Sequence, residues 1–144
     1  RGVVANRIAK INVTNGDLDA TFNPATGTQS YGFNNKVYAL AVNGSSLFVG
    51  GLFTTYRLGL AYRLAKVDMT TGALDTTFNP ATGANGTNHI VYSIISSGSD
   101  IFIGGAFTAY RGVTANRVAK INATTGVHDA TFNAGAGANG TVYA

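Results

Sequence analysis

The chain has 144 residues, of which 45% are hydrophobic and 11% charged, and its formal net charge is +4. The apolar share is sufficient for a folded core and excludes a disordered chain, while the absence of cysteine excludes disulfides and thiolate metal centres. No run of about 18 apolar residues is present, so no membrane insertion is predicted.

The first predicted element, residues 1–24, recurs twice further along the chain. The alignment is set by Arg1, Arg57 and Arg111, which lie 56 and then 54 residues apart. Internal repeats of this length are typical of solenoids and propellers. Because the chain begins inside a repeat, we expect it to be a piece of a longer protein.

Each complete repeat is predicted to hold four short strands. In the first complete repeat they lie at 37–42, 46–51, 62–68 and 74–79, and each is rich in β-branched or aromatic residues. No segment has the apolar period of a capped helix. Four antiparallel strands in about 54 residues are typical of a β-propeller blade, so we predict an all-β fold.

The predicted units make a single propeller segment, 1–144, of about 2.7 blades. They are a half blade at 1–24, blades at 37–80 and 91–134, and the start of another blade at 142–144. A propeller closes with roughly 4 to 8 blades. The remaining blades of a longer chain, or further copies of this one, are therefore expected partners.

A glycine closes the loop before the fourth strand of every repeat. VTNG, MTTG and ATTG suit a four-residue loop, in which a type I turn is followed by Gly in the left-handed conformation. A two-residue loop would instead place Asp68 opposite Asp75, an unfavourable pair of like charges. The predicted four-residue loop sets a lysine opposite an aspartate in each repeat: Lys10 with Asp19, Lys66 with Asp75, and Lys120 with Asp129.

Other recurring residues are predicted to stabilise the scaffold. Arg7, Arg63 and Arg117 are expected on the opposite strand face from the lysines, donating to backbone carbonyls between blades. The glycine pairs at 50–51 and 104–105 are expected to permit a bulge or close packing of adjacent blades. Five phenylalanines are core candidates: Phe22, Phe53, Phe78, Phe107 and Phe132.

The most specific strings of the repeat are LFVGGLFT and IFIGGAFT, the strands NRIAKIN, YRLAKVD and NRVAKIN, and the segments LDATFNP and LDTTFNP. These strings resemble the delta-60 repeats of bacterial β-propellers, over nearly the whole chain. Two departures are Tyr62, where the other repeats have Asn, and Ala134, where they have Pro. The resemblance implies a propeller from a large, exported or surface-associated bacterial protein, and it implies no catalytic residues.

The positive charge does not indicate a nucleic-acid surface. Apart from Lys36, every lysine and arginine recurs at an equivalent position of the repeat, so the charge follows the scaffold. No nucleic-acid partner is therefore predicted.

The sequence contains little catalytic or metal-binding chemistry. Asp17 and Asp19 lie beside a turn in one repeat only, which favours turn chemistry over a paired-carboxylate site. His89 and His128 occupy different repeat positions, and neither has a second histidine or a cysteine nearby, so no zinc site is predicted. No calcium-loop pattern is present, and we predict no metal, cofactor or enzymatic activity. A hydrolase that uses polar residues of further blades is an alternative.

The candidate binding residues lie on loops at one end of the predicted ring, where connections between blades meet the loops from second to third strands. They are Tyr31, Phe33, Tyr56, Arg57, His89, Tyr110 and Arg111. Tyrosine and arginine are favoured at recognition hot spots. The alternative is that Tyr56 and Tyr110 simply pack between blades.

These patterns favour a non-enzymatic interaction or structural module of a secreted or cell-surface bacterial protein. The expected partner is a protein or glycan surface. The alternative is a carbohydrate-binding lectin with repeated weak sites on the Tyr/Arg loop face.

Overall fold

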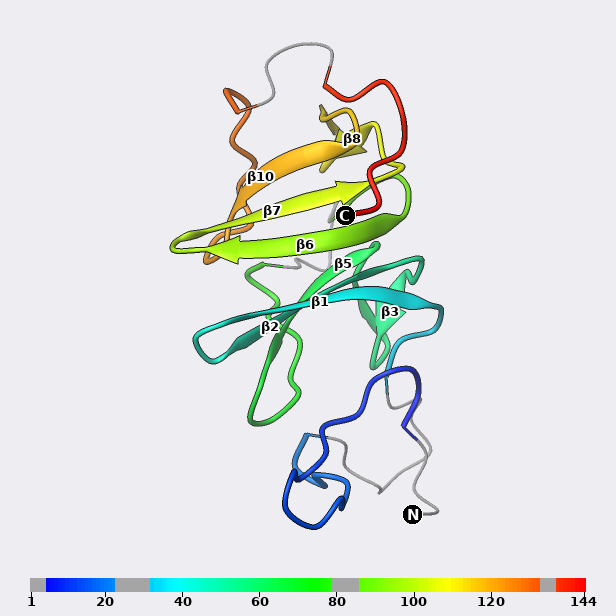
Figure 1. Cartoon of the computed structure of the whole chain (residues 1–144), viewed down its shortest axis with the longest axis vertical. Helices are drawn as coiled ribbons and strands as arrows, with labels where there is room; N and C mark the ends of the chain where they lie inside the picture. The colour runs from blue at the N-terminus through cyan, green and yellow to red at the C-terminus, as the bar shows by residue number, and fades with distance from the viewer. Residues whose placement is uncertain (1–4, 23–31, 79–85, 133–136) are drawn as a thin grey trace.

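The computed structural model describes residues 5–22, 32–78, 86–132 and 137–144 (Figure 1). The regular structure within these ranges is β throughout, with strands and no helix. The described residues therefore include no helix that could cross a membrane. The predicted all-β class is confirmed.

Two three-stranded antiparallel sheets form the body of the molecule. The first contains, in spatial order, β1 (Val37–Asn43), β2 (Ser46–Gly51) and β5 (Leu64–Asp68). The second contains β6 (Val91–Ser97), β7 (Asp100–Gly105) and β10 (Val118–Asn122) in the same arrangement. Two short hairpins that sequence analysis missed pair β3 (Thr55–Tyr56) with β4 (Gly59–Leu60), and β8 (Ala109–Tyr110) with β9 (Val113–Thr114).

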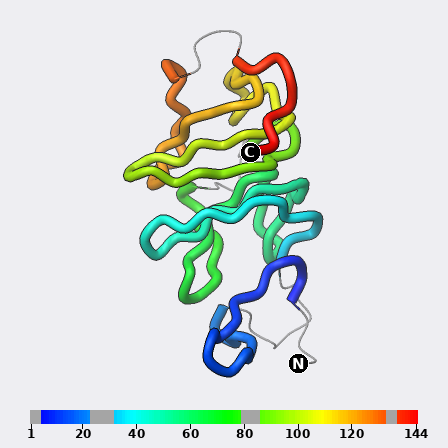
Figure 2. Tube along the Cα trace, in the orientation of Figure 1, coloured from blue at the N-terminus to red at the C-terminus, as the bar shows by residue number. Residues whose placement is uncertain are grey.

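The sheets lie one beside the other, with β6 against β1 and β2 (Figures 1 and 2). Because side chains alternate along a strand, β2 contributes to two cores. Val49 packs in a cluster with Ile8 and Phe22 of the preceding repeat. Phe48 packs on the other face, in a cluster with Ile101 and other residues of the second sheet. The hydrophobic core therefore lies between successive repeats, not within one.

Four of the five predicted core phenylalanines are buried, namely Phe22, Phe53, Phe78 and Phe107. The prediction for Phe132 was wrong, because its side chain is 45% exposed. Phe78 and Phe132 are equivalent in the repeat, but only Phe78 belongs to the cluster between the two sheets. Burial at this position depends on the repeat that follows.

The strand predicted at 74–79 is also largely wrong. It is reduced to a single antiparallel bridge between Val67 and Leu74. The carboxylate of Asp75 then accepts hydrogen bonds from Thr77 N at 2.9 Å and Phe78 N at 3.1 Å. Such a side-chain turn competes with strand pairing, so the chain bends away from the sheet. Residues 79–85 lie outside the described ranges.

The predicted four-residue loop and its register are confirmed. Asp75 N donates to Lys66 O at 2.8 Å, and Lys66 Nζ lies 2.9 Å from Asp75 Oδ2. Gly72 closes the loop with a φ of 64°. The equivalent ion pairs are Lys10 with Asp19 at 2.8 Å and Lys120 with Asp129 at 3.1 Å. Each aspartate thus pairs with a lysine and also turns the chain.

The recurring arginines do not lie on the strand face that was predicted for them. Arg7, Arg63 and Arg117 have φ values of 65°, 61° and 68°, a left-handed conformation that cannot continue a strand. Accordingly β5 begins at Leu64 and not at Tyr62. The predicted bond between repeats is present at Arg7, which donates to Phe33 O at 2.6 Å, whereas Arg117 donates to Phe107 O within its own repeat.

The glycine pairs permit both features expected of them. The register between β1 and β2 shifts at Tyr38, so that Val37 faces Gly51 and Ala39 faces Gly50. A Cβ on Gly50 would lie 2.6 Å from Val91 Cγ1 of the next sheet. Glycine therefore accommodates a bulge on one side and a closely packed neighbour on the other.

Candidate functional site

The two candidate tyrosines in the short hairpins point inward. Tyr56 is buried, and its hydroxyl donates to Gly72 O at 2.8 Å. Tyr110 is equally buried and donates to Gly126 O at 2.9 Å. Burial raises the pKa of Tyr110 to about 12, against the opposing effect of the neighbouring Arg111 charge. Each hydroxyl therefore links a short hairpin to the glycine loop of the same repeat. Both tyrosines thus stabilise the packing of their repeat.

The adjacent arginines connect successive repeats. Arg57 adopts a φ of 46°, and its guanidinium donates to Phe22 O of the preceding repeat and to Thr71 O at 3.3 Å. Arg111 has a φ of 47° and donates to Phe78 O in the same way. Each guanidinium also lies beside the ring of the preceding tyrosine. These donors are directed at backbone carbonyls.

Asn34 is a scaffold residue that sequence analysis missed. Its side-chain oxygen accepts from Thr54 N at 2.9 Å and Thr55 N at 3.1 Å, and its amide nitrogen donates to Thr54 Oγ1 at 2.8 Å. Asn88 makes the equivalent three bonds in the next repeat. The recurrence of an asparagine shortly before each first strand could have indicated this role.

The remaining candidate residues do not assemble into one site. The ring of Phe33 is buried, with its centroid 4.2 Å from that of Phe53 and 4.5 Å from that of Tyr56. His89 is exposed. Tyr31 lies outside the described residues. The loop face proposed from sequence thus has most of its Tyr, Phe and Arg groups engaged in packing or in backbone hydrogen bonds.

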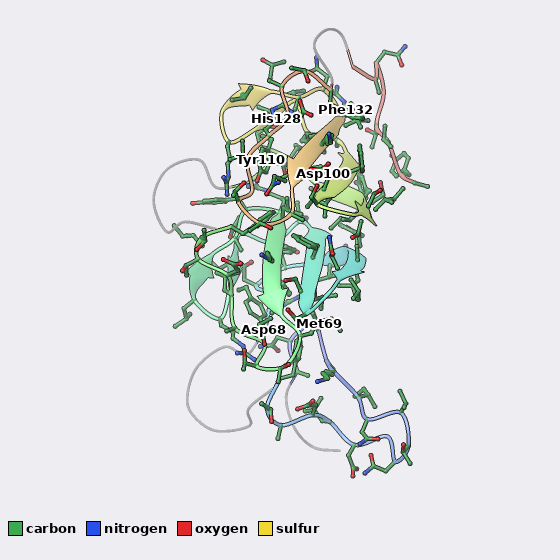
Figure 3. All side chains as sticks on the ribbon, turned by 90° about the vertical axis from the view of Figure 1, so that its left-hand side faces the viewer. Asp68, Met69, Asp100, Tyr110, His128 and Phe132 are labelled. Atoms are coloured by element: carbon green, nitrogen blue, oxygen red, sulfur yellow. The ribbon has the colours of Figure 1, made fainter. Side chains whose placement is uncertain are left out.

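His128 lies beside Tyr110, on the return segment after β10 (Figure 3). The ring centroids are 6.1 Å apart, and neither imidazole nitrogen has a hydrogen-bond partner among the described residues. Next to it, the Thr131 hydroxyl and Lys120 lower the pKa of Asp129 to about 2. Within the described ranges, no three His, Cys, Asp or Glu side chains come together as metal ligands would.

Replacing His128 with leucine, the residue at the equivalent positions 18 and 74, is expected to make stability less dependent on pH. Burial lowers the pKa of His128 below its ordinary value of 6.5, while Asp129 opposes this shift. Below pH 6.5 the unfolded chain therefore binds more protons at this position, and stability falls as the pH falls. Urea unfolding at pH 7.5 and pH 5 measures the effect. The exposed His89→Leu serves as control, and an equal loss of stability on acidification in H128L and the original chain would contradict the prediction.

Comparison with a family model of known proteins gives a match to one part of the chain. Residues 100–132 match a family model described as a domain of unknown function (DUF5122) beta-propeller. The chain is a β-propeller segment. The matched residues run from β7 through β10 to Phe132, so they cover most of one blade. No curated protein and no solved structure matches the chain.

Proposed function

We propose that the chain is a non-enzymatic module of a secreted or cell-surface bacterial protein, in which propeller blades form an interaction or structural scaffold. The finer assignment to the delta-60 repeats is part of this proposal. One observation carries it: the recurring Tyr, Arg and Asn side chains make hydrogen bonds that stabilise the scaffold. The bacterial surface location rests on the sequence resemblance, and protease accessibility on intact cells tests it.

The partners proposed for this segment are further blades of the same kind, in a longer chain or in further copies. The outer face of the second sheet favours this partner, because Ile95 is 63% exposed and Phe132 is 45% exposed. Phe78, the equivalent of Phe132 in the preceding blade, is fully covered. A Cβ on Gly104 would lie 2.7 Å from Val142 Cγ1, just as one on Gly50 would meet Val91. Val142 therefore occupies the position of a following first strand.

Extending the chain by one blade is expected to raise the midpoint of urea unfolding. The extended chain consists of residues 1–141 followed by a second copy of residues 91–144, which keeps the repeat in phase. Stability in repeat arrays includes a term for each new interface. Because the added blade covers Phe132, the loss of unfolding free energy caused by Phe132→Ala should also rise, from about 1 to about 3 kcal/mol.

The matched control is an extension whose added copy carries Ile101→Asp and Ile103→Asp. Both isoleucines belong to the cluster that faces the preceding blade, so this copy cannot cover an apolar neighbour. If the unaltered extension leaves the midpoint and the Phe132→Ala cost unchanged, the scaffold proposal fails.

A lectin with sites on the Tyr/Arg loop face has less support. Tyr56 and Tyr110 are buried, and the hydroxyl of each is already bonded to a backbone carbonyl. Stacking against a sugar needs an exposed ring, so these two residues favour packing.

A further inference from the structure

Three tyrosines form a second aromatic group, distinct from the buried pair. Tyr38 in β1 and Tyr92 in β6 are each the second residue of their strand, and Tyr143 follows a valine in the same way near the end of the chain, outside the strands. The ring centroids of Tyr38 and Tyr92 lie 5.2 Å apart, and those of Tyr92 and Tyr143 lie 4.9 Å apart. We refer to these three residues as the tyrosine column.

The tyrosine column remains accessible, in contrast to Tyr56 and Tyr110. Tyr38 is 44% exposed, and Tyr92 is still partly exposed although it has a column neighbour on both sides. Among the described residues no hydrogen bond uses a hydroxyl of the column, whereas the buried tyrosines each donate to a glycine carbonyl. The column therefore presents ring surface together with available hydroxyl groups.

The backbone directs these side chains away from the core. Both Tyr38 and Tyr92 are the extra residue where the register of the first strand shifts against the second strand. A bulge places its extra residue outside the regular alternation and re-aims the side chain. The exposed position of the column is thus built into each blade by the bulge opposite the glycine pair.

The surroundings of the column favour a neutral ligand with many hydroxyl groups. Neither β1 nor β6 contains a charged residue. The exposed Lys36 directly precedes β1, but the equivalent residue before β6 is Ile90, so no charge recurs beside the column from blade to blade. Aromatic rings supply apolar surface for the C–H faces of a pyranose, and the tyrosine hydroxyls of the column can pair with the hydroxyls of the sugar.

We propose that the tyrosine column binds an extended, neutral oligosaccharide chain along the first strands of successive blades. This inference rests on the proposed interaction module and names its partner class. Because the rings contact one another from blade to blade, they form one continuous surface that suits a polymer. Each blade adds a weak contact, so affinity should rise with the length of the sugar chain.

Affinity electrophoresis of the full chain in native gels containing a soluble β-glucan, mannan or galactan tests the proposal. We expect retardation by at least one polymer, and a loss of affinity of about tenfold in a Tyr38→Ala/Tyr92→Ala double variant. The chain has seven tyrosines and no tryptophan, so quenching of tyrosine emission gives a second readout. Tyr38→Ala alone, at an exposed position, covers the case in which the double variant does not fold.

Tyr62→Asn is the matched control, because it removes a tyrosine outside the column and introduces the residue found at positions 6 and 116. It should bind as the original chain does. No retardation by any of the three polymers, or retardation that the double variant retains, overturns the proposal. Concentration-dependent dimers that Tyr38→Ala abolishes would also overturn it, by assigning the column to contact between copies. If no polymer retards the chain but the added blade raises the midpoint of urea unfolding, the oligosaccharide proposal fails and the scaffold proposal is retained.

Discussion

Replacing Phe78 with alanine is expected to lower the free energy of unfolding by about 3 to 5 kcal/mol. The ring is fully buried between the two sheets, in edge-to-face contact with Phe48 at a centroid distance of 5.3 Å. Its removal leaves a cavity that the surrounding strands cannot close. For a domain whose total stability is about 5 to 15 kcal/mol, this loss is large. Urea unfolding monitored by circular dichroism measures it.

Phe132→Ala provides the control for this prediction. Phe132 makes the same edge-to-face contact within its own blade, with Phe102 at 5.2 Å, but it is 45% exposed. We expect its replacement to cost about 1 kcal/mol. The two variants differ mainly in whether a following blade covers the ring. Equal costs would show that burial between blades is not the source of the stability.

Gly86→Ala is expected to destabilise the chain by about 3 kcal/mol or more, at the upper end of what overpacking usually costs. A Cβ at this position would lie 1.9 Å from Tyr62 O, a backbone atom that cannot rotate away. The same carbonyl accepts a hydrogen bond from Thr87 N at 3.2 Å, so relieving the clash would separate two blades at their connection.

Thermal unfolding of Gly86→Ala beside Gly140→Ala tests this expectation. A Cβ on Gly140 would have nothing within 4 Å among its surroundings, and Gly140 does not adopt a positive φ. Its replacement should change stability by no more than about 0.5 kcal/mol. A G86A variant as stable as G140A would mean that the close approach of the two backbones is not required.

The sequence was sufficient to predict those features that depend on neighbouring residues. The unfavourable pairing of Asp68 with Asp75 decided between two loop lengths, and the structure has the predicted register. The same segment misled the prediction of the fourth strand. Asp75 both pairs with Lys66 and accepts two backbone N–H bonds, and the second role ends the strand. The spacing of Asp75 and Thr77 is typical of such a side-chain turn, whereas the prediction continued the strand through it.

Other features could not be predicted because they depend on contacts between blades. For Tyr56 the sequence left binding and packing open as alternatives, and only the contacts with the preceding blade decide for packing. The left-handed conformation of Arg63 has no local signal, since glycine is the residue that usually indicates it. Conversely, Tyr38 is strand-forming by type, and its exposed position follows from a bulge opposite two glycines.

Arg57 and Arg111 both donate back to a carbonyl of the preceding blade, which has a consequence for synthesis on the ribosome. The carbonyl of Phe22 receives its donor, Arg57, 35 residues later, and that of Phe78 receives Arg111 33 residues later. At roughly 5 to 20 residues per second, the ribosome needs roughly 2 to 7 seconds to add the residues between each of these carbonyls and the arginine that binds it. During this interval the most recently synthesised blade lacks the hydrogen bond from the arginine of the next blade. The array therefore acquires its final stability in the order of translation, one blade behind the growing end.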